Sequence, residues 1–202
     1  TVLELFLVLM ARKYGMTTVF FDKDRGAEIA IRALGGKYQN LRRGIPTGYN
    51  PFLRPDTERN NDFLFRLMRQ LVGRELSPRE EQELNSAIRE IMRSSDHVRS
   101  ISGLCQLLPP TDERSLHAHL QPWCRGGRLG WVFDNPEDCL DLETGDLFGF
   151  DDTELLDDPE VSVPLTMYLL HCTETLIDGR RFCYVMAEFW KRLDSPAFTD
   201  FA

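Results

Sequence analysis

The first forty residues alternate between helix and strand patterns, and this alternation constrains the possible folds more than any other feature of the sequence. Residues 2–14 are apolar on nearly every side and stop before Gly15, which predicts a buried helix. Thr17–Asp22 is β-branched and aromatic and ends in a charge, which predicts a short buried strand. A helix over 25–34 and a strand over 36–41 are predicted next. Such alternation is typical of a parallel sheet covered by helices, so we predict an α/β fold.

A helical segment interrupts this sheet pattern. The first helix is predicted over 60–72, where apolar residues gather on one face. Ser77-Pro78-Arg79-Glu80 then offers a cap, a helix-starting proline and a capping-box glutamate for a second helix. Two shorter helices are predicted over 97–108 and 112–122. We therefore expect 57–125 to be an all-helical insertion between strands of the sheet.

The sheet pattern returns after this insertion. Strands are predicted over 128–134 and 146–150, and a long helix over 157–177. The continuous apolar run 182–187 is typical of a central parallel strand that is buried on both faces. The predicted organisation is thus a first part of the sheet domain, a helical insertion and a second part of the sheet domain: 1–56, 57–125 and 126–202.

The composition excludes several classes of protein. A hydrophobic fraction of 42% is enough for a packed core and excludes a disordered chain. The net charge of −8 argues against a chain whose main task is to coat nucleic acid. The longest strictly apolar run, Leu5–Ala11, is far shorter than the roughly 20 residues of a membrane span. The odd number of cysteines, 5, favours free thiols in a reducing compartment.

Charged residues follow two of the predicted strands directly. Lys23-Asp24-Arg25 comes after Thr17–Asp22, and Glu188 comes after the apolar run that ends at Ala187. Ligands of open parallel sheets bind beyond the carboxyl ends of the strands. A carboxylate at such an end can orient a water molecule for attack on a phosphate or bind magnesium through water. These two strand ends are therefore the predicted site of any chemistry.

Four segments of the sequence resemble a known family when they are taken in order. Phe20–Glu28 followed by Ile31–Gly36, the loop Pro46–Phe52 and the stretch Ala187–Lys191 resemble the ATPase domain of type IV secretion and conjugation systems, the CagE/TrbE/VirB family. The last stretch is similar to the Walker B region of that family. The resemblance extends over essentially the whole chain. It implies a RecA-like P-loop NTPase core with a mostly parallel sheet and an all-helical insertion, incomplete at both ends.

The resemblance also implies ATP and Mg²⁺ as ligands and assigns residues to them. Thr1 falls at the last position of the Walker A loop, where its hydroxyl would bind magnesium if the loop were complete. Glu188 corresponds to the glutamate that polarises the attacking water. Asp22, Asp24 and Arg25, at the other strand end, are predicted to line the nucleotide site.

One position departs from the family pattern. Ala187 stands where members of the family usually carry the aspartate that holds magnesium. An alanine side chain cannot hydrogen-bond a metal-bound water. Three interpretations stay open: weakened metal binding, substitution by another carboxylate such as Asp22 or Asp24, or a degenerate copy.

The implied function is that of an ATP-hydrolysing motor that energises type IV secretion or conjugative transfer. The resemblance implies a homo-oligomer, a hexamer in the full protein, that works with other secretion subunits at the cytoplasmic side of a bacterial inner membrane. The chain by itself is expected neither to bind ATP tightly nor to hydrolyse it, because the Walker A glycines and lysine are absent. Two alternatives remain: a non-catalytic assembly subunit and a DNA-translocating motor. The net charge weighs against direct nucleic-acid binding. The compact basic groups of note in the sequence are the pair Arg42 and Arg43 and the pair Arg66 and Arg69.

Overall fold

The computed structural model describes residues 2–188. These residues form two compact units, of which one is Gly44–Leu140 and the other consists of the described residues on both sides of it. The helical unit therefore begins earlier and ends later than the insertion expected over 57–125. None of the helices in the described part of the chain has the length and apolarity needed to cross a membrane.

The first unit is built on a parallel sheet of four strands. They are β1 (Thr17–Asp22), β2 (Lys37–Asn40), β3 (Leu147–Asp151) and β4 (Phe182–Met186), and their order across the sheet is β2-β3-β1-β4. Every pairing is parallel, so all four carboxyl ends lie at one edge of the sheet. The predicted α/β class with a mostly parallel sheet is confirmed.

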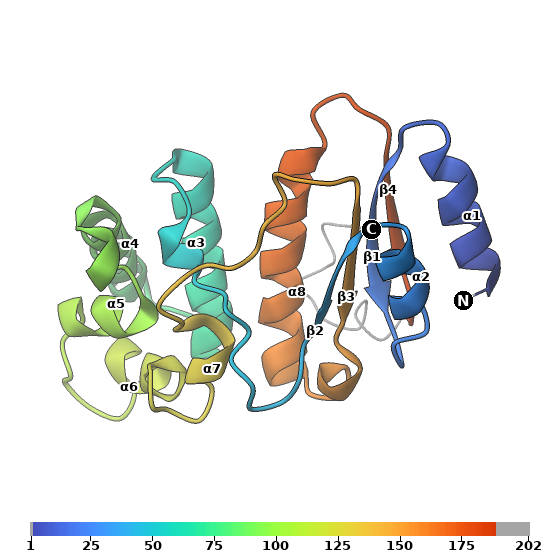
Figure 1. Ribbon diagram of the computed structural model, residues 1–202. Helices are drawn as coiled ribbons and strands as arrows, with labels where there is room; N and C mark the ends of the chain where they lie inside the picture. Colours follow the sequence, from blue (N-terminus) through green and yellow to red (C-terminus); the bar gives the residue numbers. More distant parts are fainter. Residues whose placement is uncertain (1, 189–202) are drawn as a thin grey trace. The chain divides into compact units, whose positions relative to one another are not determined.

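Two helical layers cover this sheet (Figure 1). Helices α1 (Val2–Arg12) and α2 (Glu28–Ala33) lie on one face, and α8 (Pro159–Thr173) lies on the other. Under α1 and α2 the core contains Phe20, Ile31 and Tyr38. On the opposite face the Phe21 ring lies 5.8 Å from that of Phe150. Alternate residues of β1 thus point into two separate apolar layers, which is why all of its side chains are buried.

The prediction for 182–187 was wrong in its position within the sheet. Among the described residues β4 is an edge strand with half-buried side chains, instead of a central strand buried on both faces. An apolar run shows that a strand is suited to burial and does not say which neighbours bury it.

The expected burial of the first helix was also wrong. In α1 only Val8 is buried, while Val2 is 85% and Leu3 70% exposed. Val8 and Leu5 of this helix pack on the core of the sheet. Phe6 and Leu7 are also more than half exposed, at 53% and 57%, and the sequence pattern alone could not reveal this.

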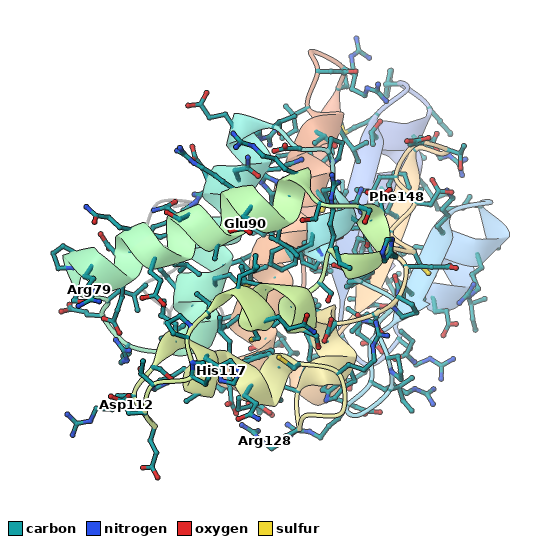
Figure 2. The ribbon with its side chains drawn as sticks, turned by 90° about the vertical axis from the view of Figure 1, so that its left-hand side faces the viewer. Arg79, Glu90, Asp112, His117, Arg128 and Phe148 are labelled. Carbon is teal, nitrogen blue, oxygen red and sulfur yellow. The ribbon has the colours of Figure 1, made fainter. Side chains whose placement is uncertain are left out.

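The second unit is helical, as expected. It contains α3 (Glu58–Val72), α4 (Pro78–Arg93), α5 (Ile101–Leu107), α6 (Leu116–Leu120) and α7 (Gly130–Phe133). Short 3-10 helices lie at Pro51–Leu53, Asp96–Val98 and Gln121–Trp123 in this unit, and at Thr153–Leu155 and Glu174–Leu176 in the first. The capping box predicted at the start of α4 is present, with Ser77 and Glu80 bonding reciprocally. Figure 2 shows Arg79 and Glu90 of α4.

The strand predicted over 128–134 is wrong, because this segment forms α7 after a tight turn. Its buried residues are Leu129, Val132 and Phe133, a spacing of three and four residues that suits a helix. Gly130 allows the turn, since a Cβ there would lie 2.3 Å from the carbonyl oxygen of Cys124. The sequence analysis assigned these apolar residues the two-residue period of a strand, whereas they follow the spacing of a helix.

Candidate functional site

Three non-glycine residues in the described part of the chain have a left-handed backbone, and all three lie at the carboxyl edge of the sheet. Asp24 has a φ of 57°, Arg25 of 56° and Glu188 of 56°. This conformation costs an L-residue about 1–2 kcal/mol. Backbone strain of this kind gathers at functional sites, where the surrounding structure holds it in place. The two strand ends singled out from the sequence are therefore also the conformationally unusual ones.

The turn after β1 is held by Asp22, which is 2% exposed. Its Oδ1 accepts a hydrogen bond from the Lys23 N–H at 2.9 Å. Its Oδ2 accepts from the Ala27 N–H at 2.8 Å and from the Tyr38 hydroxyl at 2.5 Å. Burial, together with the hydrogen bond to Asp22, raises the pKa of Tyr38 above its ordinary value. Both oxygens of Asp22 are thus engaged in fixing the turn that carries Asp24 and Arg25.

The ends of β1 and β4 meet through an ion pair. Lys23 Nζ lies 3.6 Å from Glu188 Oε1, with the two side chains 35% and 25% exposed. The Ala187 N–H donates to the Phe21 carbonyl at 2.9 Å, which continues the sheet pairing up to the residue before Glu188. The structure therefore brings together the two strand ends that the sequence analysis selected.

A third strand end contributes residues that the sequence analysis missed. Asp151 of β3 is paired in register with Asp22 of β1. The Thr153 hydroxyl donates to Asp151 at 2.5 Å and accepts from the Asp24 N–H at 2.6 Å. Burial raises the pKa of the Asp151 carboxyl. The signal was present, because Asp151 directly follows the predicted strand 146–150, and Asp22 likewise stands at the end of a predicted strand.

The side chains of Asp24 and Arg25 point to solvent. Arg25 pairs with Glu28 at 2.6 Å, and Glu28 also accepts from Arg32 at 3.0 Å. The hydrogen bond from Arg25 to Glu28, together with the negative charge of Glu28, raises the pKa of Arg25. Exposed pairs of this kind contribute little to stability. Asp24 and Arg25 are exposed, so the predicted contact with a nucleotide needs no rearrangement of buried side chains.

Some residues of the predicted nucleotide site lie outside the part of the chain that the structure describes. Thr1 lies outside the described residues, and so do Phe189, Trp190 and Lys191 of the predicted Walker B stretch. The amino end of α1, which begins at Val2, lies at the same end of the first unit as the tip of β1 (Figure 1). Helix amino ends attract phosphate groups through their unpaired N–H groups and dipole.

Metal ligands are sparse in the described residues. No group of three or more His, Cys, Asp or Glu side chains is placed there to hold a metal ion. Ala187 offers no ligand, and the oxygens of Asp22 already accept three hydrogen bonds.

The loop Pro46–Phe52, which contributed to the family resemblance, belongs to the second unit. Asn50 is buried there and donates to the carbonyls of Arg99 at 3.0 Å and Asn135 at 2.9 Å. Its side chain also accepts from the Phe52 N–H at 3.1 Å. The motif thus serves to organise the helical unit.

Comparison with known proteins identifies several relatives. PtlC, a type IV secretion system protein of Bordetella pertussis, is 44% identical over the whole chain. VirB4 proteins of the same system in Brucella suis and Bartonella henselae are each 41% identical over the whole chain. The chain spans about a quarter of their length, with 27% of PtlC covered. No family model matches it.

A solved structure shares the fold. VirB4 of Thermoanaerobacter pseudethanolicus superposes with a TM-score of 0.71 and 20% identity, covering 95% of this chain and 57% of the other. The fold is thereby supported independently of close sequence similarity. The family resemblance found in the sequence is confirmed: the chain belongs to the VirB4/PtlC family of type IV secretion system proteins.

Proposed function

We propose that this chain forms part of an ATP-hydrolysing motor that energises type IV secretion or conjugative transfer. The observation that carries the proposal is the position of Glu188. It follows β4 in a left-handed conformation, beside Lys23, at the carboxyl edge of a parallel sheet. That edge is where open α/β sheets bind ligands. The names of the relatives, which are type IV secretion proteins, supply the biological setting.

Each residue at the edge has a proposed task. Glu188 polarises the water that attacks the terminal phosphate of ATP, and Lys23 orients the Glu188 carboxylate through their ion pair. Asp24 and Arg25 line the nucleotide side of the site. Asp22 takes a supporting task, because its oxygens hold the turn on which Asp24 and Arg25 lie.

Magnesium binding is proposed for Thr1 through its hydroxyl, because the family resemblance aligns Thr1 with the last position of the Walker A loop. Magnesium keeps several of its waters and is usually held by few protein groups together with substrate phosphates. Asp24 is the exposed carboxylate at this edge that could take the place of the aspartate missing at Ala187.

The test measures ATP hydrolysis by a full-length protein that carries this chain. Glu188→Gln keeps the size of the side chain and removes its basicity, so the rate should fall by about 100-fold or more. Glu143→Gln, at an exposed position of the same unit, is the matched control and should hydrolyse ATP normally. An unchanged rate for Glu188→Gln would overturn the proposal. The isolated chain should show no turnover, and turnover that Glu188→Gln abolishes would contradict that expectation.

A second candidate function rests on Ala187. If the lost carboxylate is not replaced, the protein is a non-catalytic assembly subunit that is retained for its interactions. Ala187→Asp in the full-length protein separates the two functions. Hydrolysis by the natural protein supports the motor, whereas hydrolysis that appears only with Asp at this position supports the assembly subunit.

The full protein is proposed to act as a homo-oligomer, a hexamer by family resemblance, with other secretion subunits at the cytoplasmic side of the inner membrane. Direct nucleic-acid binding, as in a DNA-translocating motor, is disfavoured by the net charge of −8. The basic pairs are also neutralised locally, since Arg43 pairs with Asp158 at 2.7 Å and Arg69 lies 3.9 Å from Glu81. A titration of the protein with DNA at several salt concentrations tests whether it binds nucleic acid directly.

A further inference from the structure

Two cysteine thiols meet in the helical unit, far from each other in sequence. Cys124 Sγ lies 3.3 Å from Cys105 Sγ, and the residues are 19 positions apart. Cys105 lies on α5 and is 5% exposed, whereas Cys124 follows the 3-10 helix Gln121–Trp123 and is half-buried. The sulfur atoms of a disulfide are about 2.05 Å apart. The two sulfur atoms are therefore only roughly 1 Å farther apart than in a disulfide.

The backbone next to Cys124 is anchored from two elements. The Arg125 N–H donates to Asp134 Oδ2 at 2.5 Å and to Ser102 Oγ at 3.1 Å. The Ser102 hydroxyl itself donates to Asp134. Ser102 lies on α5, one turn before Cys105, so these hydrogen bonds join the loop that follows Cys124 to the helix that carries Cys105.

The two thiols are chemically unequal. A thiolate at Cys124 accepts a hydrogen bond from the Cys105 S–H, which lowers the pKa of Cys124. The same hydrogen bond, followed by burial, raises the pKa of Cys105. Because the thiolate is the nucleophile of thiol chemistry, the partly exposed Cys124 is the thiol that reacts first.

A basic hollow opens beside Cys124. Its volume is about 600 Å³, and the segment that follows the helix α6 lines it with Cys124, Arg125, Gly126, Gly127 and Arg128. Both arginines are exposed, and Figure 2 shows Arg128 on this loop. Guanidinium groups bind carboxylates through paired hydrogen bonds. The hollow thus offers a small anionic ligand a route to the Cys124 sulfur.

We propose that Cys105 and Cys124 form a thiol–disulfide pair that is oxidised by a small carboxylate-bearing disulfide of the glutathione class. The Cys124 thiolate attacks one sulfur of the bound disulfide, whose S–S bond breaks and whose other half leaves as a thiolate. The Cys105 sulfur then attacks the Cys124 sulfur, loses its proton to the released thiolate, and expels the second half. Two electrons pass from the protein to the disulfide. Cys105 supplies one proton, and the expelled second half takes from solvent the proton that Cys124 released on ionising, so two thiols are formed.

The product ties α5 to the loop that follows α6. The cross-link closes the segment between Cys105 and Cys124, which includes α6. It also fixes the position of the arginines that line the hollow. The helical unit would thereby acquire an oxidised and a reduced form with different mobility in this segment.

The first experiment treats the reduced full chain with glutathione disulfide and follows it by mass spectrometry. The wild type should lose two hydrogens, and peptide mapping should place the bond between Cys105 and Cys124. Cys105→Ser should stop at a glutathione adduct on Cys124. Cys139→Ser, which removes an exposed cysteine of the same unit, should still form the bond. Adducts on Cys139 with no reaction at Cys124 would overturn the proposal.

A second experiment tests the hollow without altering either thiol. Arg125→Gln combined with Arg128→Gln should slow the reaction with anionic glutathione disulfide by on the order of tenfold. The reaction with cystamine, a cationic disulfide, should not slow. Equal slowing with both reagents, or no slowing with either, would contradict the assignment of the arginines. Circular dichroism of each variant confirms that the helices are retained.

Discussion

Lys23 Nζ and Glu188 Oε1 lie 3.6 Å apart and join the carboxyl ends of two neighbouring parallel strands. Lys23→Met should lower ATP hydrolysis by a full-length protein, because the Glu188 carboxylate loses its orienting partner. The free energy of unfolding should change by less than about 1 kcal/mol, since the pair is partly exposed. Steady-state hydrolysis and urea unfolding measure both.

The chain offers a matched control for this change. Lys37 forms an ion pair with Asp141 and is the first residue of β2, so it lies at the amino end of a strand and away from the carboxyl edge of the sheet. Lys37→Met should leave hydrolysis unchanged. Equal losses from both substitutions would show that Lys23 acts on stability and has no specific task at the site.

The buried carboxylate Asp22 should be essential for the turn after β1. Both oxygens of Asp22 accept hydrogen bonds, so in Asp22→Asn the new amide N–H group faces a hydrogen-bond donor and one buried donor loses its acceptor. The free energy of unfolding should therefore fall by about 2–3 kcal/mol. Urea unfolding measures it. The exposed Asp178, which pairs with Arg180, gives the control Asp178→Asn, whose stability should stay close to that of the wild type. A stable Asp22→Asn would refute the supporting task of Asp22.

Backbone strain at Asp24 should be measurable as stored free energy. Asp24→Gly should raise the free energy of unfolding by about 1 kcal/mol, because glycine adopts a positive φ without steric cost. Asp24→Ala keeps the strain and should show no gain. Thermal unfolding compares the two, and a gain from Ala equal to that from Gly would mean that the backbone is not the cause.

The start of α4 should make stability depend on acid. Hydrogen bonds from Arg74 and from the Ser77 backbone and hydroxyl hold the pKa of Glu80 at about 2. Because this pKa lies below that of the unfolded chain, about 4.3, the stabilisation is complete above that value and is lost as the pH falls toward 2.

The measurement is urea unfolding between pH 7 and pH 2. Glu80→Gln should be less stable at pH 7 and should lose less stability on acidification. Ser77→Ala, which removes the cap, should cost about 1 kcal/mol at pH 7. A pH profile of Glu80→Gln parallel to that of the wild type would contradict this account.

The sequence predicted the parts of the fold that local pattern determines. The strand Thr17–Asp22 and the capping box at Ser77 were found because β-branched residues and a cap with its proline act within a few residues. The burial of α1 and the central position of β4 were wrong, because they depend on which neighbours cover an apolar face. The helix α7 was mistaken for a strand because its short apolar run fits either period.

The candidate site was predicted in part for the same reason. The rule that ligands bind at strand ends selected the segments around Asp22 and Glu188, and the parallel sheet brings these two segments together. The rule did not reveal that both oxygens of Asp22 hold the turn, since Tyr38 and Ala27 reach them through the tertiary fold. Asp151 and Thr153 were missed because only two of the strand ends were considered.

The central claim is that Glu188 performs the hydrolytic step. The most direct measurement compares ATP binding and ATP hydrolysis in a full-length protein carrying Glu188→Gln with those of the Glu143→Gln control. We predict that ATP binding is retained in both and that hydrolysis is lost only in Glu188→Gln. Hydrolysis at the control rate by Glu188→Gln, with ATP bound, would contradict the account.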